Sequence, residues 1–213
     1  MKKHVFIASV LLAITNFVMA QGSSGYGIKS GLIFSKLNVE DVSDGSESEF
    51  GLDEVRLSPS IGFFFNLFQN DNFIFQTEVS YFQKGGERTD TIRTSVVPNE
   101  NDKEVVTDLN YDYVSLGLAA LPRFSNNNFT AYGIIGLGYD FMLKARSAPI
   151  SKSEHTTTNW SYTVGLGMSS KRIFDDRVAI EIGYNSDFKE FYENENVKFS
   201  NSLFFARTAI SLN

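Results

Sequence analysis

Apolar and polar residues alternate along eight segments of this chain, which is the pattern of β-strands with one apolar and one polar face. In residues 73–87, for example, Phe75 and Val79 share one face while Gln76 and Glu78 share the other. The segments lie near residues 25–37, 57–68, 73–87, 109–124, 129–145, 159–173, 177–188 and 201–213. They are longer than the five or six residues common in soluble strands, and a tilted strand needs only roughly 9–11 residues to cross a bilayer.

Short and long connections alternate strictly between these segments. Residues 69–72, 125–128 and 174–176 are short and rich in Asn or Asp, which tolerate turn dihedrals. The other connections are long and polar, and they cover residues 38–56, 88–108, 146–158 and 189–200. Transmembrane barrels combine short periplasmic turns with longer extracellular loops. The sequence therefore predicts an all-β fold: an eight-stranded antiparallel up-and-down transmembrane β-barrel with short periplasmic turns and long extracellular loops.

The direction of the polar face decides between a membrane barrel and a soluble one. That face carries most of the strand glycines and seven charged residues, namely Lys29, Glu78, Arg123, Asp140, Lys171, Glu181 and Arg207. An eight-stranded barrel is only wide enough to be filled by side chains, and glycines alternating with long charged residues fit such a lumen. We therefore expect the apolar face to meet lipid. A soluble periplasmic barrel with its apolar face inside is the structural alternative.

The charges predicted to face the lumen should pair, because a buried charge is costly unless it has a partner of opposite sign. We expect Glu78 and Glu181 to pair with Arg207 and Lys29, with Arg123 as a further partner. Such a network would fill the barrel structurally. A proton path, an ion path or a gate is the functional alternative, which a filled bore disfavours.

Aromatic residues fall into two groups along the strands. Phe65, Phe73, Phe75, Phe129 and Phe174 lie near the short connections, and Tyr81, Tyr139, Trp160, Tyr162 and Tyr184 lie toward the long ones. Membrane barrels carry two aromatic girdles on either side of an apolar band. We expect these ten residues to mark the two membrane interfaces.

The first twenty residues have the features of a secretory signal peptide, with Lys2 and Lys3 before an apolar stretch. Cleavage after Ala20 would leave residues 21–213 as the barrel domain. It would also change the net charge from −6 to −8, because the two lysines are removed. An acidic exported protein is a poor candidate for nucleic-acid binding. The sequence has no cysteine, which excludes disulfides and thiolate metal sites, and we expect no cofactor.

Four stretches of the chain resemble a known family. They are GIKSGLIFSKL at 27–37, FQTEVSYFQKGGE at 75–87, YVSLGLAALPRF at 113–124 and AYGIIGLGYDFML at 131–143. They look like the outer-membrane β-barrel domain common in Bacteroidota, which is often labelled PorT-like and is similar in architecture to OmpX and the OmpA barrel. The resemblance implies a place in the outer membrane of a Gram-negative bacterium. The PorT label also suggests a role beside the type IX secretion system.

Catalytic chemistry has little support in the sequence. The histidine that remains after residue 20 is His155, which stands next to Ser153 and Glu154 in a long connection. Some small outer-membrane acyltransferases and deacylases use His and Ser, so a lipid-modifying enzyme is one hypothesis. Neighbours in a loop rarely supply the hydrogen-bond geometry that a Ser–His pair needs. We therefore expect a protein that is not an enzyme.

The leading functional hypothesis is a small, monomeric, non-enzymatic barrel that anchors and displays polar loops. Its wall would contact outer-membrane lipids, and residues 38–56 and 88–108 would contact other envelope or cell-surface proteins. The first of these loops is strongly acidic, and the second is mixed in charge and includes Val96 and Val97. A narrow channel, or a transport or secretion accessory, is the alternative.

Overall fold

The computed structural model describes residues 25–41, 48–49, 54–92, 103–146, 158–174, 176–188, 192–193 and 197–212. The described residues form eight long strands: β1 (Tyr26–Asp41), β3 (Glu54–Gln69), β4 (Phe73–Ile92), β5 (Lys103–Ser125), β6 (Phe129–Arg146), β7 (Thr158–Ser170), β8 (Val178–Asp187) and β10 (Val197–Ser211). Two-residue strands β2 (Ser48–Glu49) and β9 (Tyr192–Glu193) and a helical turn α2 (Lys171–Phe174) complete them. The signal peptide predicted for residues 1–20 lies outside the described residues and stays a prediction.

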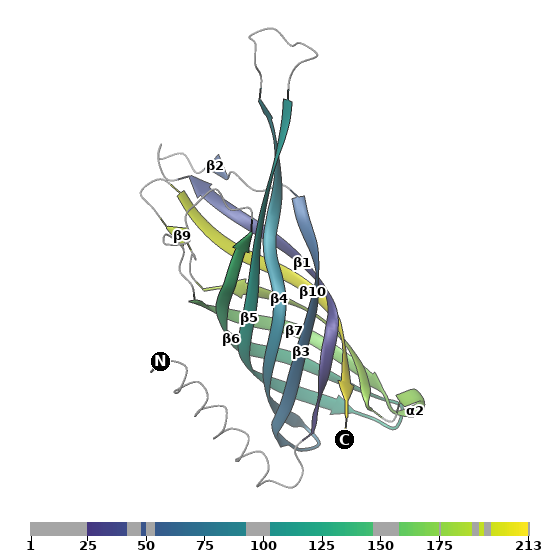
Figure 1. The fold of residues 1–213 in the computed structure, drawn as a ribbon. Helices are drawn as coiled ribbons and strands as arrows, with labels where there is room; N and C mark the ends of the chain where they lie inside the picture. The colour runs from purple at the N-terminus through teal and green to yellow at the C-terminus, as the bar shows by residue number, and fades with distance from the viewer. Residues whose placement is uncertain are drawn as a thin grey trace.

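The long strands close into a barrel, as Figure 1 shows. Each long strand pairs antiparallel with the next, and β1 pairs with β10 from Gly27↔Ser211 to Asp41↔Val197. The two short strands extend this sheet beside β1 and β10. The predicted all-β, eight-stranded antiparallel up-and-down barrel is therefore confirmed.

Asparagine side chains form two of the predicted short turns. In the β3–β4 turn, the Asn70 side-chain oxygen accepts the backbone N–H of Asn72 at 3.0 Å. In the β5–β6 turn, the Asn126 side-chain oxygen accepts the backbone N–H groups of Asn128 at 2.8 Å and Phe129 at 2.9 Å. An Asn side chain that bonds its own backbone two residues on is the local reason for a tight turn.

The third short connection differs from its prediction, because β7 ends at Ser170 and does not continue to residue 173. The Ser170 hydroxyl accepts the backbone N–H of Ile173 at 3.4 Å, as a serine at a helix N-cap does, and this starts the turn α2. Lys171 therefore lies in a helical turn at the barrel end, and its prediction as a lumen charge was wrong. Asp176 follows with a φ of 60°, a conformation that Asp tolerates better than most residues.

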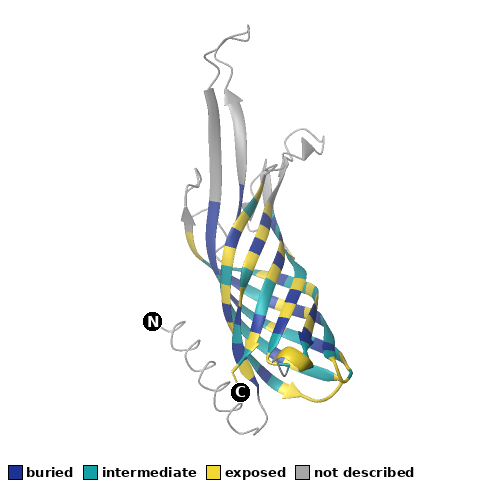
Figure 2. Cartoon of the chain, turned by 90° about the vertical axis from the view of Figure 1, so that its right-hand side faces the viewer, coloured by how far each residue is buried: buried dark blue, intermediate teal, exposed yellow. Residues whose placement is uncertain are grey.

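Buried and exposed residues alternate along the strands, and the stripes are visible in Figure 2. Large apolar side chains point outward, with Leu166, Ile180 and Ile135 each more than 60% exposed. Charged side chains such as Lys29 and Glu181 are buried inside the barrel. The apolar face is thus the outer face, as the pattern predicts.

The β4–β5 hairpin continues beyond the rest of the barrel (Figure 1). The ladder of β3 with β4 ends at Glu54↔Glu87, and that of β5 with β6 ends at Asn110↔Arg146. Past these points, the described residues of β4 and β5 pair with each other as far as Ile92↔Lys103. The hairpin is therefore a two-stranded ribbon that rises from the long-loop end of the barrel.

A contact between β1 and β4 fixes the base of this ribbon. The β3–β4 register shifts between Val55 and Ser60, so the two strands separate locally. The Ser35 hydroxyl on β1 accepts the backbone N–H of Gly85 at 3.2 Å and donates to the Gly85 carbonyl at 3.0 Å. This contact holds β4 inward at the position where Lys84, fully buried, enters the lumen.

Candidate functional site: the charged lumen

Four charged side chains meet in the middle of the lumen, and we call Lys29, Glu78, Glu181 and Arg207 the central cluster. Lys29 Nζ lies 3.2 Å from Glu78 Oε2 and 3.2 Å from Glu181 Oε2. Arg207 donates from Nη1 to Glu78 Oε1 at 2.8 Å and from Nε to Glu181 Oε2 at 2.7 Å. Each of the two cations contacts both carboxylates, and the cluster is neutral because it has two charges of each sign.

Further polar side chains surround the central cluster. Tyr132 donates its hydroxyl to Glu181 Oε1 at 2.8 Å, so that carboxylate has a partner on each oxygen. Lys29 also donates to Gln76 Oε1 at 2.6 Å, and Gln76 in turn donates to Asn66 at 2.9 Å. Buried charges are tolerated when such hydrogen bonds satisfy their remaining sites. The network therefore crosses the bore from wall to wall.

A second group of charges, nearer the long loops, consists of Lys84, Asp140 and Asp187, and we call it the outer cluster. Lys84 Nζ lies 2.8 Å from Asp140 Oδ2 and 2.7 Å from Asp187 Oδ1. Asn201 donates to Asp187 Oδ2 at 3.3 Å. All three charged side chains are at most 2% exposed. The outer cluster forms a second layer of buried ion pairs above the central one.

Aromatic rings line the lysine of the outer cluster. The Lys84 ammonium lies 5.4 Å from the centroid of the Phe82 ring and 5.2 Å from that of Tyr113. These two rings stack with their centroids 6.1 Å apart. A desolvated ammonium gains from a nearby aromatic face, so the rings stabilise Lys84 on the sides that its carboxylates leave open.

Small cavities lie on both sides of the central cluster. One of about 90 Å³ is lined by Lys29, Glu78 and Arg207 and extends toward the outer cluster. Another, of about 130 Å³, lies toward the short-turn end and is lined by Arg123 and Tyr132 among others. The central cluster lies between them, and its ion pairs cross the described lumen at that level.

The predicted lumen residues separate into three sets. The structure brings Lys29, Glu78, Glu181 and Arg207 together, whereas Asp140 belongs to the outer cluster. Arg123 lies at the short-turn end, where its Nη1 donates to the Asn70 carbonyl at 3.4 Å, and Lys171 lies in α2.

Lys84 and Asp187 were missed by the sequence analysis, although the alternation of their strands contains the signal. Lys84 has the same parity as Glu78 on β4, and Asp187 has the same parity as Glu181 on β8. Both positions lie inside the predicted segments 73–87 and 177–188, so parity within those segments was enough to place them on the lumen face.

Aromatic side chains gather outside the barrel toward the long-loop end. The ring of Tyr139 lies 4.9 Å from that of Trp160, and the ring of Tyr162 lies 6.3 Å from that of Tyr184, centroid to centroid. Phe188 also contacts this group through Tyr162. The belt thus includes four of the five residues predicted for that rim.

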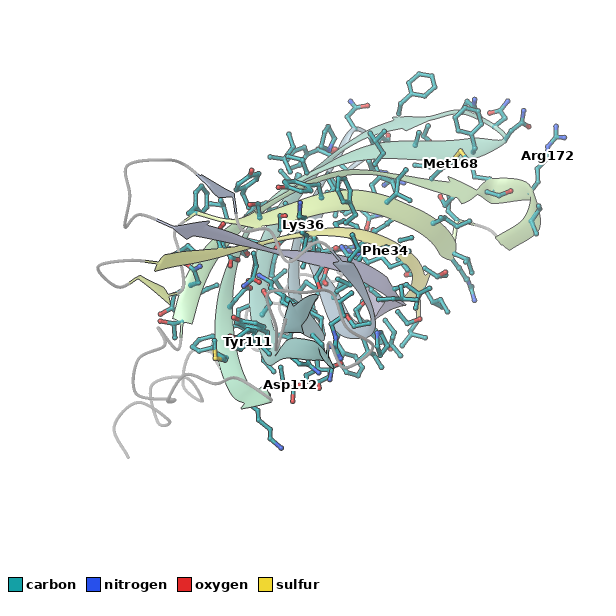
Figure 3. The ribbon with its side chains drawn as sticks, turned by 90° about the horizontal axis from the view of Figure 1, so that it is seen from above. Phe34, Lys36, Tyr111, Asp112, Met168 and Arg172 are labelled. Atoms are coloured by element: carbon teal, nitrogen blue, oxygen red, sulfur yellow. The ribbon has the colours of Figure 1, made fainter. Side chains whose placement is uncertain are left out.

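The opposite end of the barrel carries fewer aromatic contacts among the described side chains. Phe129 lies 6.5 Å from Phe124, whose side chain is 66% exposed, and Phe75 is 36% exposed. In Figure 3, Met168 and Arg172 lie at one end of the barrel, whereas Tyr111 and Asp112 lie at the other. The side chain of Phe174 lies outside the described ones, so its predicted place in a girdle stays a prediction.

Several predicted features fall outside the described residues. These are His155 with Ser153 and Glu154, and parts of the loops at 38–56 and 88–108. Within the described ranges, no group of three or more His, Cys, Asp or Glu residues is placed to hold a metal ion. No helix in the described part of the chain is long and apolar enough to span a membrane.

Comparisons with known proteins agree with this architecture. The sequence model of the family described as outer membrane protein beta-barrel domain matches residues 5–205. The match is to the general domain, so the narrower PorT-like assignment stays a prediction. A search of curated proteins gives no match.

Among solved structures, similar chains of low identity include outer-membrane and surface proteins. OprG of Pseudomonas aeruginosa is 13% identical, with a TM-score of 0.49 over 90% of this chain and 97% of that one. Ail of Yersinia pestis is 15% identical, with a TM-score of 0.37 over 88% and 99%. The Neisserial surface protein A is 11% identical, with a TM-score of 0.40 over 89% and 99%. These values are too low to transfer any binding property to this chain.

Proposed function

This chain belongs to the outer membrane protein beta-barrel domain family, and on that premise we propose that it is a non-enzymatic barrel that anchors and displays surface segments. A barrel of this family resides in the outer membrane of a Gram-negative bacterium. The proposal rests on one observation: two layers of buried ion pairs fill the lumen, while a long β4–β5 ribbon leaves the barrel. A filled bore serves as an anchor, and the ribbon offers contact surface to other envelope or cell-surface proteins.

The ion pairs inside the lumen are the part of the proposal that argues against transport. Each carboxylate of the central cluster is bonded to both Lys29 and Arg207, so an ion passing through would have to separate several short contacts. Breaking a buried pair costs about 3–5 kcal/mol, which is far above thermal energy. In a planar bilayer, the purified barrel should therefore show no stable conductance steps.

The ribbon is tested by chemical labelling on cells. Because the sequence contains no cysteine, one Cys can be introduced within residues 93–102 and another within the short connection 69–72. A membrane-impermeant maleimide should label the first on intact cells and the second only after the outer membrane is opened. The reverse labelling would refute the orientation on which display depends.

The displaying role itself is tested with a photo-crosslinking residue at position 89 on the ribbon and, as a control, at position 164 on the lipid-facing wall. We expect a protein adduct in living cells from position 89, absent from position 164. A variant that lacks residues 88–108 should still fold into a barrel. In cells from which the natural protein has been deleted, it should fail to restore function. Full function without the ribbon would contradict the proposal.

A narrow channel or secretion accessory is the second candidate, and the paired cavities favour it. Spaces of about 90 and 130 Å³ flank the central cluster, so its rearrangement would join them. Conductance that appears when Glu78 is replaced by Gln, but not in the unaltered barrel, would support a gated path.

A lipid-modifying enzyme remains a third hypothesis that only the sequence suggests. Its candidate residue His155 lies outside the described residues. An unchanged lipid profile after deletion of the protein would refute it.

A further inference from the structure

The outer cluster carries a net charge of −1, whereas the central cluster is neutral. Its single cation, Lys84, faces two carboxylates. Asp187 uses both of its oxygens, one toward Lys84 and one toward Asn201. Asp140 gives Oδ2 to Lys84, but its Oδ1 is buried without a hydrogen-bond partner. A buried carboxylate oxygen with excess negative charge is costly, so this oxygen marks a place for a positive partner.

Several other oxygens converge beside Asp140 Oδ1, in the space that the missing side chain of Gly138 leaves. A Cβ at Gly138 would lie 2.6 Å from Ser161 Oγ, 3.3 Å from Ser115 Oγ and 3.4 Å from Asp140 Oδ1. Ser161 is fully buried, and its Oγ has no hydrogen-bond partner in the described residues. Three oxygens from three neighbouring strands therefore surround one point.

The same point opens onto a cavity with room for a small ligand. Ser115, Gly138 and Asn185 line the cavity of about 90 Å³ above the central cluster. Asn185 also presents a buried side-chain oxygen without a partner. A water-sized occupant needs roughly 10–15 Å³ of such space, so the cavity of about 90 Å³ has room for an ion together with several waters.

We propose that the outer cluster binds a monovalent metal cation, Na⁺ or K⁺, in this niche. Hard cations prefer oxygen ligands, and carboxylate, hydroxyl and amide oxygens are the donors present here. Asp140 Oδ1, Ser161 Oγ and Ser115 Oγ are the direct ligands, and Asn185 Oδ1 acts directly or through water. One positive charge brings the outer cluster to neutrality, while a divalent ion would leave it positive beside Lys84.

The position of the niche indicates from which end of the barrel the cation enters. Asp140 pairs with Asn159 in the β6–β7 ladder, next to the Tyr139↔Trp160 pair of the outer aromatic belt. The niche therefore lies near the long-loop end and above the central cluster. Ions enter from that end, and the bound cation helps to close the lumen and does not pass through it.

The test measures whether monovalent metal cations stabilise the folded barrel. The purified full chain in detergent is heated at constant ionic strength in NaCl, in KCl or in N-methylglucamine chloride, and its folded fraction is read from gel mobility. Na⁺ or K⁺ should raise the midpoint temperature relative to N-methylglucamine. Above the dissociation constant, each tenfold increase in the ion should add about 3–5 °C for a domain of this size.

Matched glycine variants separate the niche from general salt effects. Gly138→Ala places a methyl group between the ligand oxygens and should abolish the ion dependence without changing any charge. Gly136→Ala, on the same strand and the same face, meets the Leu118 carbonyl at 3.1 Å and none of the niche oxygens, so it should keep the dependence. Asp140→Asn makes the outer cluster neutral, so it too should lose the ion dependence if Gly138→Ala fails to fold.

Other outcomes would overturn the proposal. If the midpoint of the unaltered barrel is the same in all three salts, a proton balances the charge and no metal cation binds. If Ca²⁺ or Mg²⁺ stabilises the barrel at far lower concentration than Na⁺ or K⁺, the ion is divalent. If Gly138→Ala and Gly136→Ala respond equally to Na⁺ and K⁺, the stabilising ion lies elsewhere.

Discussion

Replacing Arg207 by Met should strongly destabilise the barrel, because Glu78 and Glu181 would then share a single cation. Arg207 makes charge-assisted contacts of 2.8 Å to Glu78 and 2.7 Å to Glu181, and only Lys29 would remain to face both carboxylates. Removing one partner of a buried ion pair costs about 3–5 kcal/mol. Both Arg207 and Glu78 retain 15% side-chain exposure, so we expect a loss of about 3 kcal/mol, at the lower end of that range.

A second substitution should restore part of this loss. In the double variant Arg207→Met with Glu78→Gln, Lys29 again faces one carboxylate, that of Glu181, and the cluster is neutral. Side chains in one network typically couple by about 0.5–3 kcal/mol. We expect about 2 kcal/mol of coupling, so the double variant should be more stable than Arg207→Met alone.

The assay is equilibrium unfolding in urea of the barrel refolded into lipid vesicles. Trp160 is the only tryptophan in the sequence and lies 56% exposed on the outer wall, so its emission reports the loss of contact with lipid. The free energy of unfolding is compared among the unaltered barrel, both single variants and the double variant. A loss below about 1 kcal/mol for Arg207→Met, or the absence of coupling, would refute the reasoning.

Three further predictions use the same assay. Tyr132→Phe should cost about 1.5–3 kcal/mol, since it removes a hydrogen bond to the ionised Glu181, and a loss below 0.5 kcal/mol would argue against that bond. Gly167→Ala should cost about 1–3 kcal/mol, because its methyl group would collide with the Tyr132 ring, whereas Gly117→Ala meets only contacts of 3.8 Å or more and should cost less. Leu166→Arg should cost about 2–4 kcal/mol in a bilayer, because Leu166 is 65% exposed on the lipid-facing wall; a neutral effect would show that this wall does not meet lipid.

The strands and their faces could be predicted because each depends on local alternation. The outward side of Leu166 and the inward side of Glu181 follow from the alternation within their own strands. Asn70 and Asn126 indicate turns because their side chains bond the backbone within three residues. A strand whose apolar face must meet lipid cannot slip by one residue, because every side chain would then change face. These features therefore need no knowledge of the neighbouring strands.

The division of the lumen charges into two clusters could not be predicted from parity alone. Arg207 reaches Glu78, 129 residues away, only because the tilt and stagger of the closed barrel bring them to the same level. Asp140 faces the lumen as these residues do, but it lies nearer the long-loop end, where it meets Lys84. The level of a residue along the barrel axis depends on the registers of all eight strands together, and no single segment contains that information.

Side-chain hydrogen bonds to the backbone also changed the strand pattern at two positions. Lys171 continues the polar face of β7 in sequence, yet the Ser170 hydroxyl caps a helical turn and removes it from the lumen. At Gly85, the Ser35 side chain satisfies backbone groups that a neighbouring strand would otherwise pair. Both cases depend on a side chain competing with the backbone ladder, which a pattern of hydrophobicity does not register.

The central claim is that the apolar face of a closed barrel meets lipid, and the position of Trp160 tests it most directly. The full chain is refolded into vesicles in which the acyl chains carry bromine, a contact quencher of indole emission, and the fluorescence is compared with that in unbrominated vesicles. The account predicts strong quenching by the bromolipids and little by aqueous acrylamide, since Trp160 lies on the outer wall within the aromatic belt. Emission that is unchanged by bromolipids would contradict the account, because Trp160 would then face the interior of an inverted, soluble barrel.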